Sequence, residues 1–323
     1  MKRREFLQGI GLAAGQLMLG ASFPPLGVSA APGKGYYHIL LLSDLHLPWR
    51  EKNFPIRDEQ EMVRAAKMQL LANVNSWTDV DEAAILGDLA ARYGWEEEFA
   101  WVDAYLNNLR MPWYAVAGNH DYAYVNKTGE AGKLKRGTYA EKRAKLLAFT
   151  RRYRLPDVYY ARSIGNCRLL YLAPDACSDL NVELSPEQLT WLEREISTHS
   201  QAPILFFCHA PLLGTLRTYR KKINTPGTTA QPADKLSTIL ASCPNGSLWL
   251  SGHTHTPVSN DSFADDRVNR YNANLVNIHN PTLDNRRLCT NSLYLYPNKI
   301  VIRTYDHTKG QWLDNLERVY QML

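Results

Sequence analysis

The sequence predicts one α/β domain, and two observations support this. Short apolar runs of strand length alternate with helical patterns over most of the chain, as in sheets that carry helices on their faces. From about Ala273 the pattern changes to strands that follow one another without helices. After residue 30, no internal repeat, low-complexity tract or Gly/Ser linker interrupts the chain, so we expect one domain over residues 31–323.

Six near-continuous apolar runs are predicted to be buried strands. Their length and composition indicate a sheet that is covered on both faces. They are residues 38–43, 82–87, 112–117, 167–173, 203–208 and 247–251.

Helices are predicted where apolar residues recur every three or four positions, over residues 57–74 and 95–109. The helix from Pro186 to about Thr198 has the clearest start, because Ser185 can cap it and Gln188 completes a capping box. In the tail, residues 275–278, 292–296 and 299–304 are predicted to be antiparallel strands, with a hairpin turn at 297–298. Residues 124–137 and 214–232 are predicted to be long loops of the kind that often bind ligands.

The first thirty residues read as an export signal. A basic start at residues 2–4 is followed by an uncharged run from Phe6 to Gly33, with small residues before an expected cleavage after Ala30. The arginine pair followed by Glu-Phe-Leu resembles the twin-arginine signal, so we expect the twin-arginine machinery to export the folded chain to the periplasm or the medium. The alternative is a membrane anchor, which the glutamines and prolines in this run disfavour.

Charge and cysteine content exclude several other classes of protein. The net charge of +5 is too mild and dispersed to indicate nucleic-acid binding, and no later stretch has the ~20 apolar residues of a membrane helix, so we expect no stable nucleic-acid or membrane partner. The five cysteines show no Cys-x-x-Cys spacing, which argues against a zinc knuckle. Their odd number leaves at least one thiol free, and Cys208 in its apolar run is the best candidate for a buried one.

Polar clusters follow five of the predicted strands directly. In open α/β sheets the carboxyl ends of the strands form the ligand-binding edge. The clusters are Asp44-Leu45-His46, Gly87-Asp88, Gly118-Asn119-His120-Asp121, His209, and Gly252-His253-Thr254-His255. Each cluster alone is a common turn or core motif, but the five together in this order indicate one site.

The residue types in these clusters predict a centre for two divalent metal ions. Carboxylate, amide and imidazole groups bind Mn, Fe or Zn, and seven candidate ligands suit two ions that share a carboxylate. Two ions roughly 3.5–4 Å apart can stabilise the attacking and leaving oxygens of an in-line displacement at phosphorus. They also lower the pKa of bound water, so that hydroxide is available near neutral pH.

The ordered motifs resemble the calcineurin-like metallophosphoesterase superfamily, over about two thirds of the chain from Asp44 to His255. The resemblance implies two mixed β-sheets packed as a sandwich flanked by helices, in four α/β/β/α layers. It implies catalytic roles for His120 and Asp121, with His120 assisting the leaving oxygen while hydroxide attacks phosphorus in line. The ligand sets that it implies share Asp88: Asp44, His46, Asp88 and His255 for the first ion, and Asp88, Asn119, His209 and His253 for the second.

Features outside the ligand set bear on the branch of the superfamily. Gly-Asp-Leu-Ala at 87–90 and the segment from Ser185 are similar to the class III cyclic-nucleotide phosphodiesterase branch, although His209-Ala210-Pro211 replaces the His-His-Pro of that branch. The tyrosine that purple acid phosphatases carry shortly after Gly-Asp is not found here, where Leu89-Ala90-Ala91 follows. Arg92 stands at the spacing of a phosphate-binding arginine in protein phosphatases.

The two long loops carry basic and aromatic residues that suit a small phosphoester substrate. Charge would bind phosphate and a ring would stack on a base, although a solvated charged surface is an equally good interpretation. The residues are Lys133, Lys135, Arg136, Tyr122 and Tyr124 around the first loop, and Arg217, Tyr219, Arg220, Lys221 and Lys222 in the second. A nuclease and a non-catalytic metal-binding module remain as alternatives to a hydrolase of small phosphate esters.

Overall fold

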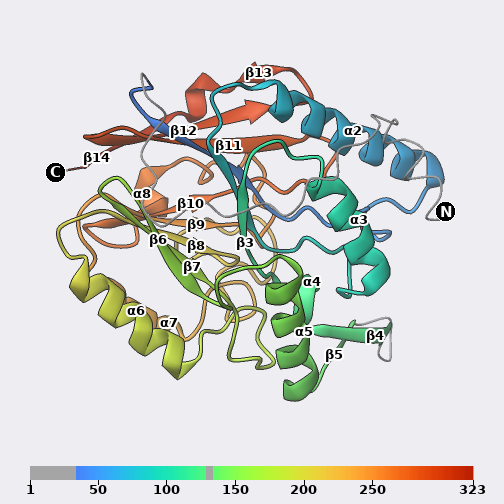
Figure 1. The fold of residues 1–323 in the computed structure, drawn as a ribbon, viewed down its shortest axis with the longest axis horizontal. Coiled ribbons are helices and arrows are strands. Elements are labelled where there is room, and N and C mark those ends of the chain that lie inside the picture. The colour runs from blue at the N-terminus through green and yellow to red at the C-terminus, as the bar shows by residue number, and fades with distance from the viewer. Residues whose placement is uncertain (1–33, 129–133, 323) are drawn as a thin grey trace.

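The computed structural model describes residues 34–128 and 134–322 (Figure 1). The expected export signal over residues 1–30 and the side chain of Lys133 lie outside the described residues. Within the described ranges, no helix combines the length and the apolar character needed to cross a membrane.

The larger sheet has seven strands and is mixed. Its order is β13-β12-β11-β1-β2-β3, with β14 paired to β12. The first three strands along the chain run parallel, and the late strands add to them antiparallel. The strands are β1 (Tyr37–Leu42), β2 (Glu82–Leu86), β3 (Trp113–Val116), β11 (Cys289–Leu295), β12 (Lys299–Asp306), β13 (Gln311–Trp312) and β14 (Arg318–Gln321).

The smaller sheet has five strands in the order β10-β9-β8-β7-β6, all parallel except β6. Its strands are β6 (Tyr160–Ile164), β7 (Cys167–Leu172), β8 (Ile204–Cys208), β9 (Ser247–Ser251) and β10 (Leu275–His279). A separate hairpin consists of β4 (Tyr124–Thr128) and β5 (Leu134–Arg136).

The two sheets pack face to face with helices outside them, which confirms the predicted four layers (Figure 1). Alternate residues of β8 show the arrangement: Phe207 packs in the core between the sheets, and Phe206 packs outward in the cluster formed with α6 and α7. The helices are α2 (Arg57–Ser76), α3 (Glu96–Leu106), α4 (Asn119–Tyr122), α5 (Tyr139–Arg152), α6 (Pro186–Thr198), α7 (Ala233–Leu240) and α8 (Asp266–Asn269), with a 3-10 turn at Asp314–Leu316.

All six buried strands predicted from apolar runs are present, with ends that differ by one residue or coincide. Two expectations about the remaining segments are wrong. Residues 275–278 form β10, which lies parallel to β9 rather than antiparallel to the tail strands. Residues 124–137 contain the β4–β5 hairpin and are not one long loop, whereas residues 214–232 contain no helix or strand.

The capping box predicted at α6 is only half formed. The Ser185 hydroxyl accepts a hydrogen bond from the Gln188 backbone N–H at 3.1 Å, as expected. The Gln188 side chain instead bonds to Ala173, and Asp175 accepts the Ser185 N–H at 2.8 Å. A carboxylate from the preceding loop therefore replaces the reciprocal side chain of the box.

All five cysteines are buried and free, so no disulfide contributes to the fold. Burial raises the pKa of the Cys208 thiol to about 12, which confirms the buried, unreactive character expected for it.

Candidate metal centre

The seven predicted ligands converge where the carboxyl ends of strands from both sheets meet. Asp44 and His46 follow β1, Asp88 follows β2 and Asn119 follows β3, so four come from the larger sheet. His209 follows β8, and His253 and His255 follow β9 of the smaller sheet. The acidic and imidazole groups form two clusters suited to a metal ion, and both clusters include Asp88.

The first cluster brings together Asp44, His46, Asp88 and His255. The Nε2 atom of His255 lies 3.1 Å from Asp44 Oδ1 and 3.2 Å from His46 Nε2. His46 Nε2 lies 3.6 Å from Asp88 Oδ2. Asp44 Oδ1 is buried and accepts no hydrogen bond from the described residues. A buried carboxylate oxygen in this state, facing two imidazole nitrogens, fits a cation as its partner.

The second cluster brings His209 and His253 to the other side of Asp88. His209 Nε2 lies 3.2 Å from Asp88 Oδ2 and 3.1 Å from His253 Nδ1. Asn119 adds an amide whose Oδ1 is buried without a hydrogen bond among the described residues. The amide Nδ2 donates to the Tyr124 hydroxyl at 3.3 Å, so the oxygen is the atom left for an ion.

Backbone carbonyls orient three of the four histidines for metal binding. Nδ1 of His46 lies 3.3 Å from the Ala90 carbonyl oxygen, and Nδ1 of His209 lies 2.7 Å from that of Leu86. His253 uses the opposite nitrogen, with Nε2 at 3.1 Å from the Gly227 carbonyl oxygen. Each carbonyl accepts an N–H from one ring nitrogen, so the other ring nitrogen, which faces the cluster, is the atom that a metal ion would use.

His255 is oriented by Arg50, a residue that the sequence analysis missed. Arg50 Nη2 lies 3.1 Å from His255 Nδ1, and Arg50 Nε donates to Asp284 at 2.7 Å. A guanidinium can only donate, so His255 Nδ1 accepts this bond. An ion bound at His255 Nε2 would place a proton on Nδ1, and the contact between Nδ1 and Arg50 would then have to break. No motif marks Arg50, since its role depends on the distant Asp284.

Five of the seven predicted ligands have a strained backbone conformation with positive φ. The φ angles are 50° at Asp44, 41° at His46, 53° at Asp88, 63° at His253 and 51° at His255. This left-handed region costs a residue other than glycine roughly 1–3 kcal/mol, and such strained residues are common at functional sites.

The glycines of the motifs allow the ligand loops to approach closely. A Cβ at Gly252 would lie 1.8 Å from Ser43 Oγ, and one at Gly118 would lie 2.3 Å from the Asp88 backbone nitrogen. Glycine is required at both positions by neighbouring atoms.

The charges of the centre are strongly coupled. Burial disfavours the charged form of His209, but the Asp88 carboxylate outweighs burial and raises the pKa of His209 to about 9. Burial and the neighbouring His209 lower the pKa of His253 to about 4. Burial would raise the pKa of Asp88, but His209 and His120 hold it well below its usual range. The Asp88 carboxylate is therefore ionised, as an ion-bridging ligand must be.

His120 and Asp121 lie beside the ligands in different roles. The His120 N–H donates to Asp88 Oδ1 at 2.8 Å, and its Nδ1 lies 2.8 Å from the Arg92 carbonyl oxygen, which leaves Nε2 free for substrate. Asp121 accepts from the backbone N–H groups of Leu89 at 2.9 Å and Gly118 at 2.8 Å. Both Asp121 oxygens thus accept hydrogen bonds from the loops that carry metal ligands, and this suits a positioning role better than a catalytic one.

The predicted substrate residues are only partly brought to the centre. The Tyr219 hydroxyl and Arg220 both donate to the carbonyl oxygen of Thr254, between two ligand histidines. Arg217 is 55% exposed in its side chain and pairs with Asp265 at 3.4 Å. Arg92 lies 4.0 Å from Glu51 and contributes its carbonyl group to His120.

The first-loop residues of the predicted basic rim lie in different surroundings, and Lys135 is exposed. Arg136 donates to the Asn181 side chain, and Tyr122 and Tyr124 are buried. Asn181, another residue missed from sequence, also donates to the Gly227 carbonyl oxygen at 2.7 Å and lies 3.4 Å from His253 Nε2.

Comparison with known proteins agrees with this geometry. The family model described as calcineurin-like phosphoesterase matches residues 37–257. The structure of the purple acid phosphatase PPD1 from yellow lupin (Lupinus luteus) superposes with a TM-score of 0.59 at 12% identity, covering 90% of this chain and 55% of the lupin chain. The structure of PhoD gives a TM-score of 0.55 at 12% identity and covers 89% of this chain and 73% of that one.

These likenesses have limits. The chain spans about half the length of the lupin enzyme, and the low identities show a shared fold alone. No curated protein matches the sequence significantly.

Proposed function

The chain belongs to the calcineurin-like phosphoesterase family and is a phosphoesterase hydrolase, and we propose that it hydrolyses small organic phosphomonoesters or phosphodiesters with two divalent ions, Mn, Fe or Zn. One observation carries the proposal. Two ligand clusters share Asp88, and each contains a buried oxygen, Asp44 Oδ1 or Asn119 Oδ1, without a hydrogen bond among the described residues. A divalent cation in each cluster would satisfy these oxygens.

The residues of the chain have separate tasks in this reaction. Bound ions supply Lewis-acid stabilisation and a hydroxide nucleophile near neutral pH. His120, fixed through its Nδ1 by the Arg92 carbonyl group, presents Nε2 to the leaving oxygen. Arg50, if released from His255 by an ion, would offer a guanidinium group to a phosphate oxygen of the substrate.

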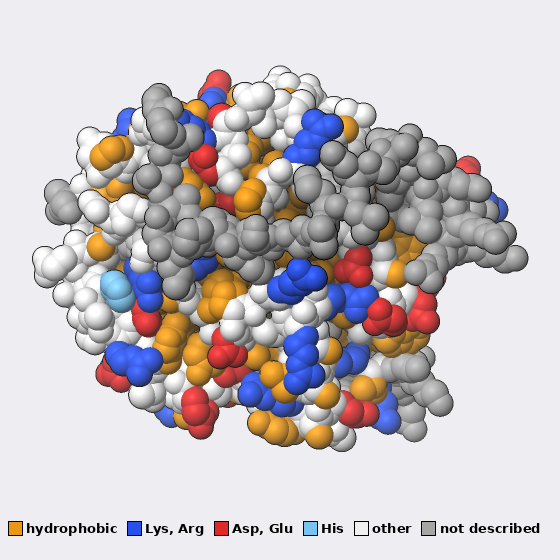
Figure 2. Space-filling model, viewed as in Figure 1, with side chains coloured by type: hydrophobic (Ala, Val, Ile, Leu, Met, Phe, Trp, Pro, Cys, Tyr) orange, Lys and Arg blue, Asp and Glu red, His pale blue; other side chains and the backbone are white. Residues whose placement is uncertain are grey.

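A nuclease is the second candidate activity, because the same pair of ions would hydrolyse nucleic acid. On the face shown in Figure 2, the Lys and Arg side chains are interspersed with Asp and Glu and form no continuous stripe among the residues drawn in colour. This face therefore offers no basic track of the kind that a long anionic polymer needs. A non-catalytic module would not need His120 beside the shared carboxylate, yet the residue is retained.

We also propose that the twin-arginine route exports the folded chain to the periplasm or the medium, on the basis of residues 1–30. Export after folding would allow the metals to be loaded first.

The test is hydrolysis of p-nitrophenyl phosphate and bis-p-nitrophenyl phosphate by the Mn²⁺-loaded chain. We expect turnover of at least one, and its loss in Asp88→Asn together with both ions, because the shared carboxylate loses its charge. Asp261→Asn is the matched control, since Asp261 is exposed and outside both clusters. No turnover of any phosphoester by the metal-loaded chain would refute the proposal.

A further inference from the structure

Arg50 lies at the metal centre, although it is not a candidate ligand. Its Nη2 lies 3.1 Å from His255 Nδ1. The His46 ring lies 5.2 Å from the His255 ring and 5.0 Å from the His120 ring, measured between centroids. Burial lowers the pKa of His46 well below its usual value, and the charge of Arg50 adds to this effect. The Arg50 guanidinium therefore stands beside a group of three neighbouring histidines at the first cluster.

The Asp284 carboxylate holds this guanidinium in place. Arg50 Nε donates to Asp284 Oδ2 at 2.7 Å, and Asn53 Nδ2 donates to the same oxygen at 2.6 Å. The Asp284 side chain is fully buried, and Lys67 Nζ lies 3.8 Å from its other oxygen. Hydrogen bonds between charged groups are short and favour one geometry. The Nε atom of Arg50 is thus held at Asp284, while Nη2 reaches His255.

The backbone that leads to Arg50 is also held by a buried side chain. Lys67 belongs to α2, and its Nζ donates to the carbonyl oxygens of Leu45 at 2.6 Å, His46 at 3.2 Å and Pro48 at 3.2 Å. These carbonyl groups belong to the segment that carries the first ligand motif and continues to Arg50. The fold therefore sets the position of the guanidinium relative to the first cluster, as a binding group in a preorganised site requires.

An ion in the first cluster would take away the acceptor of Arg50 Nη2. A guanidinium only donates, so His255 Nδ1 accepts the bond in this structure. An ion at His255 Nε2 would place the proton on Nδ1, and the bond would be lost. The Arg50 side chain is 23% exposed, so a substrate can reach it from solution. A charged phosphate oxygen would then replace the lost acceptor.

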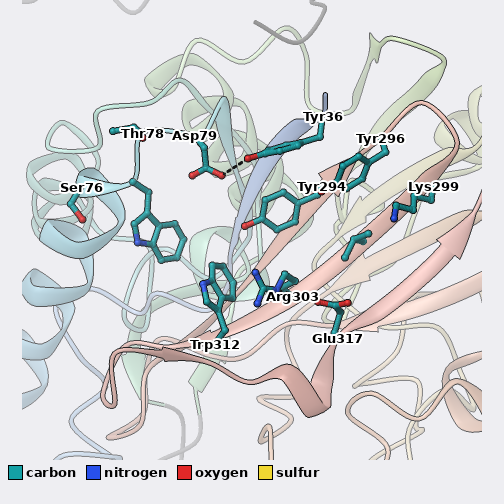
Figure 3. Close-up of a pocket in the computed structure, with 12 residues that line it drawn as sticks. Tyr36, Ser76, Thr78, Asp79, Tyr294, Tyr296, Lys299, Arg303, Trp312 and Glu317 are labelled. Atoms are coloured by element: carbon teal, nitrogen blue, oxygen red, sulfur yellow. Dashed lines mark hydrogen bonds and ion pairs between the residues drawn. The ribbon is translucent and has the colours of Figure 1, made fainter. Parts of the chain in front are cut away.

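The groove in Figure 3 offers no comparable position for a phosphate group, because its basic residues already have partners. Arg303 lies over the Trp312 ring, 4.4 Å from the centroid, and its Nε lies 3.2 Å from Glu317. Lys299 lies over the Tyr296 ring, 5.1 Å from the centroid. A phosphate group there would have to compete with these contacts, whereas an ion in the first cluster would itself free the Arg50 donor.

We propose that Arg50, positioned by Asp284, makes the metal centre select phosphomonoesters over phosphodiesters. A phosphomonoester carries close to two negative charges near pH 7 and has three acceptor oxygens. A phosphodiester carries one charge, and its second organic group takes the place of one of these oxygens. The additional charged oxygen of the monoester would accept from Arg50. This inference rests on the proposed hydrolase function and names its substrate class.

The bonds that form and break are the same for both ester classes. The oxygen of water forms a bond to phosphorus, the ester P–O bond breaks, and the leaving oxygen takes up a proton with the help of His120. Arg50 takes no part in these bond changes. Its loss should therefore act on the monoester, which has the oxygen that it binds, far more than on the diester.

The test compares p-nitrophenyl phosphate with bis-p-nitrophenyl phosphate on the full-length chain, with Mn²⁺ saturation of each variant verified by titration. Arg50→Met should lower kcat/KM for the monoester by about 10–100-fold, as expected for a hydrogen bond between charged groups, and for the diester by less than about threefold. Arg50→Lys should recover part of the monoester activity. Asp284→Asn should cause a smaller loss, again on the monoester alone. Arg267→Gln is the matched control, because its side chain is 85% exposed and pairs with Asp265 outside both clusters.

Calorimetry on the same Mn²⁺-loaded variants gives a measurement that needs no turnover. Inorganic phosphate stands for the monoester and dimethyl phosphate for the diester. Arg50→Met should bind inorganic phosphate about 10–100-fold more weakly than the unmodified chain, and both should bind dimethyl phosphate about equally.

Three results would overturn the proposal: equal losses on the two esters in Arg50→Met, an unchanged affinity of this variant for inorganic phosphate, or a higher kcat/KM of the unmodified chain for the diester. If the unmodified chain hydrolyses neither ester, the hydrolase proposal fails. The phosphate titration then still decides whether Arg50 binds the anion, so the two failures are distinguishable.

Discussion

The Tyr124 hydroxyl offers a sharp test of how the second metal position is built. It accepts a hydrogen bond from Asn119 Nδ2 at 3.3 Å and lies 3.4 Å from Asn181 Oδ1. Tyr124→Phe removes both contacts and keeps the ring. The Asn119 amide then loses the group that aims its Oδ1 at the ion, and we expect the second ion alone to bind more weakly.

The distances set the size of the effect. Both hydrogen bonds are long, so each contributes about 1 kcal/mol or less. A loss of about 1.4 kcal/mol is tenfold in affinity, which is the lower end of the 10–100-fold range for groups that orient metal ligands. We therefore expect the affinity for the second ion to fall about tenfold and the affinity for the first ion to stay unchanged. Among the ligands of the first cluster, only the shared Asp88 interacts with Tyr124, and it does so through its charge.

The assay is a titration with Mn²⁺ in which electron paramagnetic resonance follows the free ion. Tyr122→Phe is a matched control, because the Tyr122 hydroxyl donates to the Asn181 carbonyl oxygen and does not reach Asn119. Equal weakening in both variants would mean that packing, not amide orientation, is responsible. Unchanged isotherms for Tyr124→Phe would refute the reasoning outright.

Three further predictions concern catalysis, core stability and pH. His120→Ala keeps the backbone N–H that donates to Asp88, so the affinity for Mn²⁺ should persist. The kcat on p-nitrophenyl phosphate should fall by about 10²–10⁴-fold. Loss of metal in this variant would show that the His120 ring is a ligand. Arg162→Met breaks the buried ion pair with Glu82, whose closest contact is 2.9 Å, and should lower the free energy of unfolding in urea by about 3–5 kcal/mol; a change below 1 kcal/mol would contradict this. Burial lowers the pKa of His279 to about 4, so the unfolded chain binds the proton at a higher pH than the folded chain. The free energy of unfolding should therefore fall by about 3 kcal/mol as the pH falls from about 6.5 to 4. His279→Gln should therefore cost less stability at pH 4 than at pH 7, and an equal cost at both would exclude the linkage.

The buried strands could be predicted from sequence because each is a continuous apolar run, which has few alternatives in a protein of this size. The helix α5 could not. Its buried positions include Lys142, whose side chain donates to the carbonyl oxygens of Cys177 and Ser178. A lysine at a core position breaks the apolar period, so only the Thr138–Glu141 capping box marked the start of the helix.

Strand orientation depends on information that local sequence does not carry. The run that forms β10 looks like the antiparallel tail strands in composition, but it pairs with β9, and Leu275 lies opposite Ser247, 28 positions earlier. The same limit applies to the site. Five sequence motifs indicated the metal ligands. The roles of Arg50 and Asn181 could not be predicted, because they depend on contacts with residues far away in the sequence.

The metal centre joins the two sheets, so ion binding would offset part of the backbone strain at its ligands. The first cluster takes three ligands from the larger sheet and His255 from the smaller one. The second takes Asp88 from the larger sheet and His209 and His253 from the smaller one, and Asn119 after β3 would complete it through its unpaired Oδ1. Neither ion can bind until both sheets are packed, so each would stabilise the folded chain by about 2.7 kcal/mol at a hundred times its Kd. Two bound ions would therefore offset part of the backbone strain at the five ligands with positive φ, each of which costs roughly 1–3 kcal/mol.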